Sequence, residues 1–166
     1  DSNFKKLVKS ENLGRAKRID DAGGRYIEYL KSKISAQLRL DGLKIVVDCA
    51  NGAAYKVAPK VLWELGAEVI PLNVDPDGTN VNRQSGSTFP DNLINKVLEL
   101  KADVGIALDG DADRSILVDE NGLLVDGDKI LAIIGTHWKK NKSLQENSIV
   151  GTIMTNKGLE NYLLKK

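Results

Sequence analysis

Short apolar runs alternate with segments of helical periodicity along most of the chain. The runs at residues 43–49, 67–72 and 103–108 are rich in β-branched and other apolar residues, as buried strands are. Between them, residues 53–65 and 90–100 place apolar residues at the spacing of a helix. The order strand, helix, strand, helix, strand predicts a parallel sheet with right-handed crossovers.

Glycine and proline adjust the helix boundaries. Residues 19–34 also show helical spacing, but the pair Gly23-Gly24 leaves the start of that helix uncertain. Pro59 lies inside residues 53–65 and predicts a kink or a late start there. Pro90, by contrast, suits the first turn of the helix that it opens.

The second half of the chain begins with a hairpin signature. Glu120-Asn121-Gly122 separates the predicted strands 115–119 and 123–126. The remaining predicted elements are a helix over 126–138, a strand over 148–154 and a helix from 156 to 164. We therefore expect an α/β fold: a three-layer domain with a mainly parallel sheet, helices on both faces and an antiparallel hairpin at one edge.

Composition narrows the class of protein. No apolar run is long enough to cross a bilayer, and residues 1–6 lack the apolar core of a signal peptide. The 24 basic residues nearly balance the 23 acidic ones, which argues against a nucleic-acid or membrane partner. The single cysteine, Cys49, is expected to be a small buried residue, and one unpaired thiol fits a reducing cytoplasm.

The most informative motif is Asp109-Gly110-Asp111-Ala112-Asp113-Arg114, directly after the strand at 103–108. In parallel sheets, ligands bind beyond the carboxyl ends of the strands. Three carboxylates at alternate positions can offer oxygen ligands to a hard cation, and their mutual repulsion makes a role without a cation costly. We expect Asp109, Asp111 and Asp113 to bind a divalent cation, Mg²⁺ in the first place.

A calcium EF-hand is the competing interpretation of this motif. Asp109, Asp111, Asp113 and Glu120 occupy positions 1, 3, 5 and 12 of such a loop. Position 6 should be glycine and is Arg114, and the flanks are strand-like rather than helical. The EF-hand interpretation therefore fails.

Arg114 has two possible roles. Its planar guanidinium suits a phosphate bound beside the cation, which we favour, and it could instead pair with a neighbouring carboxylate.

Three other features are weaker candidates. The loop 83–88 resembles a phosphate cradle but is equally typical of a capped loop before a helix. The turn Asn51-Gly52-Ala53 could approach a phosphate, although it matches no glycine-rich fingerprint. His137, the only histidine, is expected at the surface or in packing rather than in catalysis.

From about Gly14 onward the chain resembles the α-D-phosphohexomutase superfamily. The resemblance is carried by residues 20–27, by residues 40–54 and, most specifically, by residues 109–114. Ala112, where the mannose and glucose branch usually has glycine, and residues 76–88 are similar to the branch that acts on glucosamine phosphates.

The resemblance implies a domain assignment. Residues 1–16 would be a tail or a remnant of a preceding domain, 17–146 the second of four domains, and 147–166 the beginning of the third. The catalytic serine would lie in the first domain, so the chain, which starts with Asp1 rather than Met, is expected to begin within a longer protein.

The activity implied is the Mg²⁺-dependent interconversion of glucosamine 6-phosphate and glucosamine 1-phosphate, which supplies UDP-N-acetylglucosamine for the cell wall. It would proceed through a phosphoserine and a bisphosphorylated sugar, with the phosphoserine as fourth metal ligand beside the three aspartates. The implied partners are a hexosamine phosphate and the other domains of the parent chain. The alternatives are a mutase acting on mannose or glucose phosphates and a non-catalytic metal-binding module.

Overall fold

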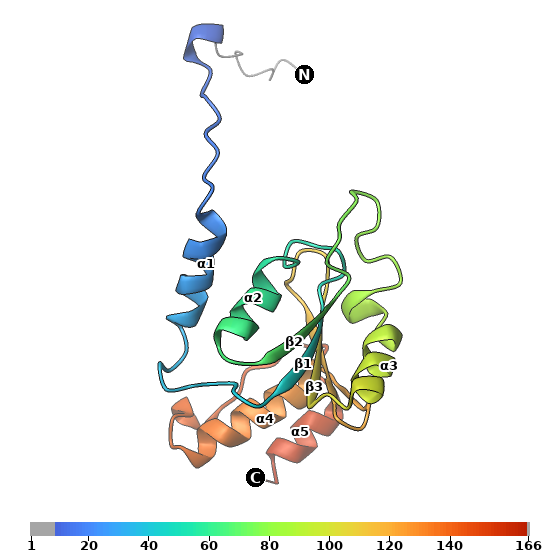
Figure 1. Ribbon diagram of the computed structural model, residues 1–166. Helices are drawn as coiled ribbons and strands as arrows, with labels where there is room; N and C mark the ends of the chain where they lie inside the picture. Colours follow the sequence, from blue (N-terminus) through green and yellow to red (C-terminus); the bar gives the residue numbers. More distant parts are fainter. Residues whose placement is uncertain (1–8, 166) are drawn as a thin grey trace, which may run out of the picture.

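The computed structural model describes residues 9–165 and contains one five-stranded sheet, with strand order β2-β1-β3-β4-β5 (Figure 1). The strands are β1 (Lys44–Asp48), β2 (Glu68–Leu72), β3 (Val104–Leu108), β4 (Ser115–Asp119) and β5 (Leu124–Val125). β1 pairs in parallel with β2 and with β3, whereas β4 runs antiparallel to both β3 and β5. The predicted parallel sheet with an antiparallel hairpin at one edge is confirmed.

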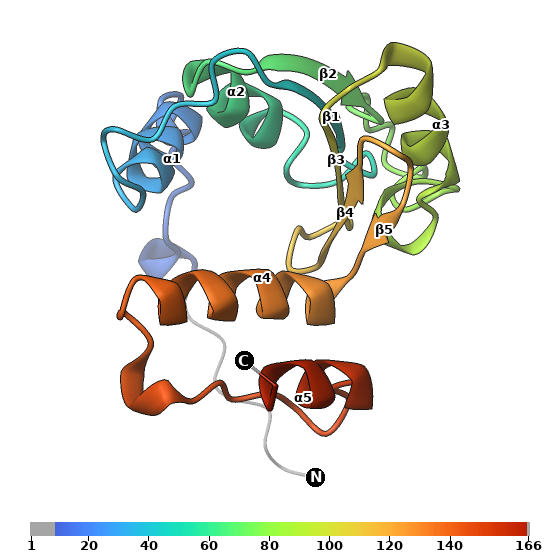
Figure 2. The same cartoon turned by 90° about the horizontal axis from the view of Figure 1, so that it is seen from below.

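Helices lie on both faces of this sheet (Figures 1 and 2). The α-helices are α1 (Ala22–Lys31), α2 (Val57–Glu64), α3 (Asp91–Leu100), α4 (Gly127–Lys140) and α5 (Lys157–Leu163), and 3-10 turns occupy Ser10–Asn12, Gly86–Thr88 and Gln145–Asn147. α3 packs on one face against β1, β3 and β4, whereas α2 packs against β2 and carries α1 on its outer side. The three-layer arrangement is therefore confirmed. Among the described residues, no helix is long and apolar enough to cross a membrane.

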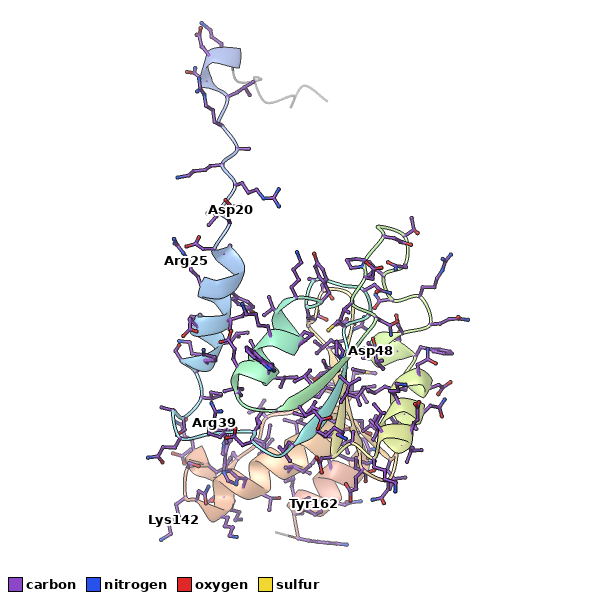
Figure 3. The ribbon with its side chains drawn as sticks, in the orientation of Figure 1. Asp20, Arg25, Arg39, Asp48, Lys142 and Tyr162 are labelled. Atoms are coloured by element: carbon purple, nitrogen blue, oxygen red, sulfur yellow. The ribbon has the colours of Figure 1, made fainter. Side chains whose placement is uncertain are left out.

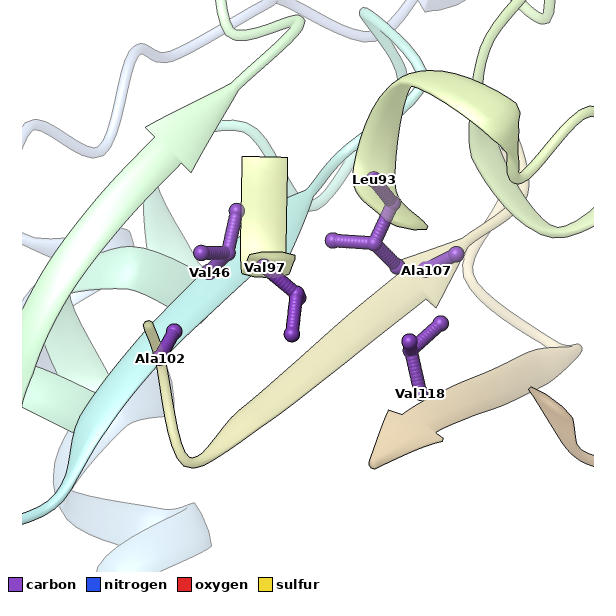
Figure 4. Close-up of a cluster of buried hydrophobic side chains, with 6 residues drawn as sticks. All are labelled: Val46, Leu93, Val97, Ala102, Ala107 and Val118. Carbon is purple, nitrogen blue, oxygen red and sulfur yellow. The ribbon is translucent and has the colours of Figure 1, made fainter. Parts of the chain in front are cut away.

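The main core lies between α3 and the sheet (Figure 4). Its buried side chains come from β1, α3, the α3–β3 connection, β3 and β4: Val46, Leu93, Val97, Ala102, Ala107 and Val118. Leu93 and Val97 are one turn apart on α3 and pack over Gly105, where a Cβ atom would collide with Val97. This packing holds α3 against β3.

Several helix boundaries differ from the predicted ones for local reasons. α2 begins at Val57, so the late start predicted from Pro59 is confirmed. α1 covers only Ala22–Lys31 of the predicted 19–34. The hairpin's second strand stops at Val125 because Asp126 instead caps α4, its side chain accepting a hydrogen bond of 2.9 Å from the Lys129 N–H.

The strand predicted over residues 148–154 is wrong. The segment is irregular, and the residues Val150 and Ile153 are 92% and 101% exposed. A strand needs hydrogen bonds from a neighbour, and none of the five described strands pairs with this segment. Of the expected tail 1–16, residues 1–8 lie outside the described residues, and residues 9–16 contain only the 3-10 turn Ser10–Asn12.

Cys49, directly after β1, is buried and forms no disulfide, as its place in an apolar run predicted. Burial, and secondarily the charge of Asp48, raise the pKa of its thiol to about 12. We expect the thiol to react with an aromatic disulfide reagent at least about 100-fold more slowly in the native chain than in guanidinium. Equal rates in the two states would contradict this burial.

Candidate metal centre

Asp109, Asp111 and Asp113 converge at the carboxyl end of β3. One carboxylate oxygen from each lies within 4.8 Å of the others, and this is the one such cluster found among the described residues. Asp109 is buried and the other two are exposed, so the cluster has a fixed inner member and two outer members facing solvent. The structure thus brings together the three side chains that the sequence indicates.

The loop is closed by Arg114. The backbone N–H of Arg114 donates to Asp109 Oδ1 at 3.1 Å, and its side-chain Nε donates to Asp109 Oδ2 at 2.8 Å. The Ala112 N–H donates to the Asp109 carbonyl at 3.1 Å, and Ala112 has a φ of 61°, in the left-handed region that favours glycine. Arg114 therefore has the carboxylate-pairing role, while its side chain stays 67% exposed beside the cluster.

The charges of the loop shift the pKa values of Asp109 and Asp113 in opposite directions. Burial alone would raise the pKa of Asp109, but the hydrogen bonds and charge of Arg114 outweigh it and lower that pKa to about 2. The pKa of Asp113 is raised, first by the charge of Asp111 and then by that of Asp109. Arg114, with Nε 3.6 Å from Asp113 Oδ1, offsets only part of this repulsion, and a cation would neutralise the rest.

This geometry fits a hard divalent cation. All three donors are carboxylate oxygens, which Mg²⁺ and Mn²⁺ prefer, and the two outer ones are accessible. The flanking elements are the strands β3 and β4, so the rejection of an EF-hand is confirmed.

Two neighbouring loops contact the backbone of the aspartate loop (residues 109–114). The Ala53 N–H donates to the Gly110 carbonyl at 2.8 Å, and Gly52 lies so close to Gly110 that a Cβ atom would collide with its backbone. On the other side, a Cβ atom on Gly110 would meet Val81 and Asn82. The aspartate loop is therefore fixed by backbone contacts as well as by Arg114.

Asp48 is a buried carboxylate that the sequence pattern does not single out. Its side chain is 0% exposed and accepts backbone hydrogen bonds from Ala50 and from Gly86. The one available signal is an acidic residue that ends an otherwise apolar buried run and directly precedes a turn. Without the fold, that signal does not reveal its partner 38 residues away.

The weaker candidates have structural roles. In the loop 83–88, Ser85 and Ser87 are buried and the Gly86 N–H donates to Asp48, so this backbone group is not available to a phosphate. The capped-loop alternative is not found either, because neither the 3-10 turn after Ser85 nor α3 has a side-chain cap among the described residues. His137 is exposed in the last turn of α4, with Nε2 2.9 Å from the Asn141 amide nitrogen. The turn at Asn51-Gly52-Ala53 packs against Gly110.

An apolar groove of about 480 Å³ opens beside the aspartate loop. α1 and α2 contribute Tyr26, Leu30 and Val61, the sheet contributes Ile106, and Asp111 lies at its rim. A lining of this kind suits packing against another apolar surface better than it suits a sugar phosphate.

Two family models match the chain. The model of the phosphoglucomutase/phosphomannomutase α/β/α domain II matches residues 24–122, more than half of the chain. The chain belongs to this family. The model of α/β/α domain III of the same family matches residues 126–166, so residues 123–125 fall between the two matches. The expected domain change after residue 146 stays a prediction, and α4 contacts both β5 and α5.

Curated relatives and solved structures agree with this membership. The chain is 58% identical over 159 residues to the phosphoglucosamine mutases of Methylobacterium nodulans and Bradyrhizobium diazoefficiens, covering 96% of this chain and 36% of each relative. A crystal structure of a phosphoglucomutase/phosphomannomutase family protein from Burkholderia thailandensis has a TM-score of 0.60 at 31% identity, covering 72% of this chain and 26% of that one. A putative phosphomannomutase from Thermus thermophilus, with a TM-score of 0.63, 19% identity and coverage of 77% and 30%, shares the fold.

Proposed function

We propose that the chain supplies the metal-binding loop of a phosphoglucosamine mutase. The observation that carries the proposal is the convergence of Asp109, Asp111 and Asp113 at the carboxyl end of β3. The 58% identity to phosphoglucosamine mutases supports the glucosamine branch, and the chain spans about a third of the length of those relatives. The proposed reaction is the interconversion of glucosamine 6-phosphate and glucosamine 1-phosphate, in the cytoplasm, as a step toward cell-wall precursors.

Each loop residue has a proposed task in that reaction. Asp109, Asp111 and Asp113 hold Mg²⁺, and a phosphoserine oxygen from another domain of the parent chain is the fourth ligand. Bound Mg²⁺ supplies positive charge against the phosphoryl group in transfer. Asp109 stays ionised because Arg114 lowers its pKa, so the inner ligand does not need to lose a proton before binding.

Arg114 is proposed to serve both the loop and the substrate. Its Nε donates to Asp109, and among the described residues no hydrogen bond from its two terminal nitrogens is found. The side chain is 67% exposed beside the cluster, so these nitrogens are accessible to a phosphate bound beside the cation. Pairing with Asp109 therefore orients the guanidinium as well as balancing its charge.

A chimeric enzyme tests the proposal. The matched segment of the Bradyrhizobium diazoefficiens mutase is replaced by this chain, and turnover of glucosamine 6-phosphate, mannose 1-phosphate and glucose 1-phosphate is measured. We expect glucosamine turnover within roughly tenfold of the parent, about 1.4 kcal/mol of transition-state stabilisation. Introducing Asp111→Ala into the chimera should lower turnover at least about 100-fold.

The other outcomes separate the alternatives. A folded chimera that turns over none of the three sugars would favour the non-catalytic metal-binding module. Preference for mannose or glucose phosphate would favour the other branch. The 166-residue chain alone, given glucosamine 6-phosphate and a bisphosphate activator, should show no turnover, and turnover by it would refute the assignment of the nucleophile to another domain.

A further inference from the structure

Asp48 is a carboxylate with no part in the proposed chemistry and no exposure to solvent. It is the last residue of β1 and is buried; Figure 3 labels it between the sheet and the start of α3. Its Oδ1 accepts the Ala50 N–H at 2.8 Å, and its Oδ2 accepts the Gly86 N–H at 2.9 Å. One side chain therefore joins the two loops that follow β1 and precede α3.

Both of these loops touch the backbone of the aspartate loop or of the strand that leads into it. Gly86 has a φ of 73° and lies where a Cβ atom would collide with the Leu108 carbonyl and the Ala50 side chain. Beyond Ala50, the Ala53 N–H donates to the Gly110 carbonyl at 2.8 Å. Asp48 is thus linked to Leu108 through Gly86, and to Gly110 through the turn that runs from Ala50 to Ala53.

The turn that Asp48 holds is conformationally unfavourable. Ala50 and Asn51 have φ values of 51° and 49°, in the left-handed region that favours glycine, and the alanine in particular is strained there. Such conformations persist where the surroundings fix them. Here the fixing bonds are from Ala50 N–H to Asp48 and from Asn82 N–H to the Ala50 carbonyl at 3.0 Å.

A carboxylate is the side chain that this arrangement requires. It offers two acceptor oxygens and no donor, which matches two convergent backbone N–H groups. An asparagine of the same size keeps one acceptor and turns an NH₂ group toward the second N–H, so one of the two loops loses its bond.

We infer that Asp48 is a positioning residue for the metal centre. It fixes the position of the aspartate loop by accepting hydrogen bonds from the two loops that contact it. This rests on the proposed metal-binding role of Asp109, Asp111 and Asp113. It adds a buried residue that does not touch the cation and yet controls how tightly the cation is held.

Asp48→Asn in the full chain tests the inference, with Mn²⁺ as the probe in calorimetric titration and in its electron paramagnetic resonance spectrum. We expect Mn²⁺ to bind about tenfold more weakly, as for other groups that orient metal ligands without binding the metal. The matched control is Val97→Ala, which opens a cavity in the α3 core without touching either loop. It should lower the melting temperature but leave Mn²⁺ affinity unchanged.

The Mn²⁺ affinities of the wild type and the two variants separate the possible explanations. Unchanged Mn²⁺ affinity in Asp48→Asn, with the wild-type chain binding normally, overturns the inference and leaves the proposed function standing. Equal weakening in Val97→Ala also overturns it, because loss of stability alone would then explain the effect. Absence of Mn²⁺ binding by the wild-type chain refutes the proposed metal role instead.

A measurement on the wild-type chain covers the case in which Asp48→Asn does not fold. Because coupling is reciprocal, a cation held through Asp48 must also stabilise the bonds of Asp48. Adding Mg²⁺ should slow hydrogen exchange of the Gly86 and Ala50 amides several-fold while leaving the Ala102 amide, bonded to the Val97 carbonyl, unaffected. Exchange of Gly86 and Ala50 that ignores Mg²⁺ overturns the inference.

Discussion

Replacing Asp111 by alanine is expected to remove most Mg²⁺ and Mn²⁺ binding. Asp111 is one of three carboxylates within 4.8 Å of one another, and no hydrogen bond or ion pair of its side chain is found among the described residues. Affinity for hard cations follows the number and charge of the oxygen ligands. Loss of a direct ligand should cost at least as much as the roughly 100-fold upper end seen for groups that only orient ligands.

The same substitution should leave the metal-free fold intact or make it more stable. The charge of Asp111 is the main cause of the raised pKa of Asp113, so its removal relieves a repulsion. The pKa of Asp113 should fall toward its ordinary range. Asp109→Ala would give a less clear result, because Asp109 also accepts both hydrogen bonds that close the loop.

Calorimetric titration with Mn²⁺ and thermal unfolding with EDTA or Mg²⁺ check this result. Asp75→Ala is the matched control: it removes the same charge from another exposed loop position whose side chain has no hydrogen bond within the described range. It should keep both Mn²⁺ affinity and the rise in melting temperature on adding Mg²⁺. An Asp111→Ala chain that titrates like the wild type would refute the metal assignment.

Local pattern was sufficient to predict the parts of the fold whose stability is local or repetitive. β1 and β3 are short, mostly apolar runs: residues 45–48 of β1 are all buried, and β3 alternates buried with partly buried residues. Their sequences show this directly. The aspartate loop could be placed because the carboxyl end of a central strand is a fixed location in any sheet of this type. The turn at Gly122 could likewise be predicted, because a tight hairpin turn needs a positive φ and glycine adopts it without strain. Gly122 has a φ of 80°.

Long-range contacts explain what the pattern did not predict. Asp48 and Gly86 are 38 residues apart, and nothing local to either indicates that they are bonded. The sequence offered Arg114 two partners, a phosphate beside the cation and a neighbouring carboxylate. The folded loop places its Nε 2.8 Å from Asp109 Oδ2. Residues 148–154 have the composition of a strand, but composition does not provide the neighbouring strand that β-structure needs.

Gly52→Ala is expected to produce the second large effect, through backbone packing rather than charge. A Cβ atom at this position would lie 2.6 Å from Gly110 Cα and 2.7 Å from its carbonyl carbon, and nearer still to the carbonyl oxygen. These are backbone atoms, so no side-chain rotation can relieve the contact. Overpacking of this kind costs about 2–3 kcal/mol, which corresponds to a fall in melting temperature of roughly 4–12 °C.

Mn²⁺ affinity should independently report a displacement of the aspartate loop in Gly52→Ala. Gly110 lies between Asp109 and Asp111, and the Ala53 N–H that follows Gly52 donates to its carbonyl. If an alanine pushes the two loops apart, the first two carboxylates move relative to each other, and Mn²⁺ affinity falls together with stability. A stability loss with normal Mn²⁺ affinity would mean that the aspartate loop does not depend on its contact with Gly52.

Gly127→Ala is the control that makes this result specific. Apart from its chain neighbours and the backbone of its own helix, no described atom lies within 4 Å of the position that its Cβ would occupy. It is the first residue of α4, where alanine favours the helix. It should unfold at the wild-type temperature or slightly above it. Because the two variants add the same methyl group, a difference between them measures the contact between Gly52 and Gly110 rather than the general effect of replacing glycine. Equal melting temperatures for both would contradict that contact.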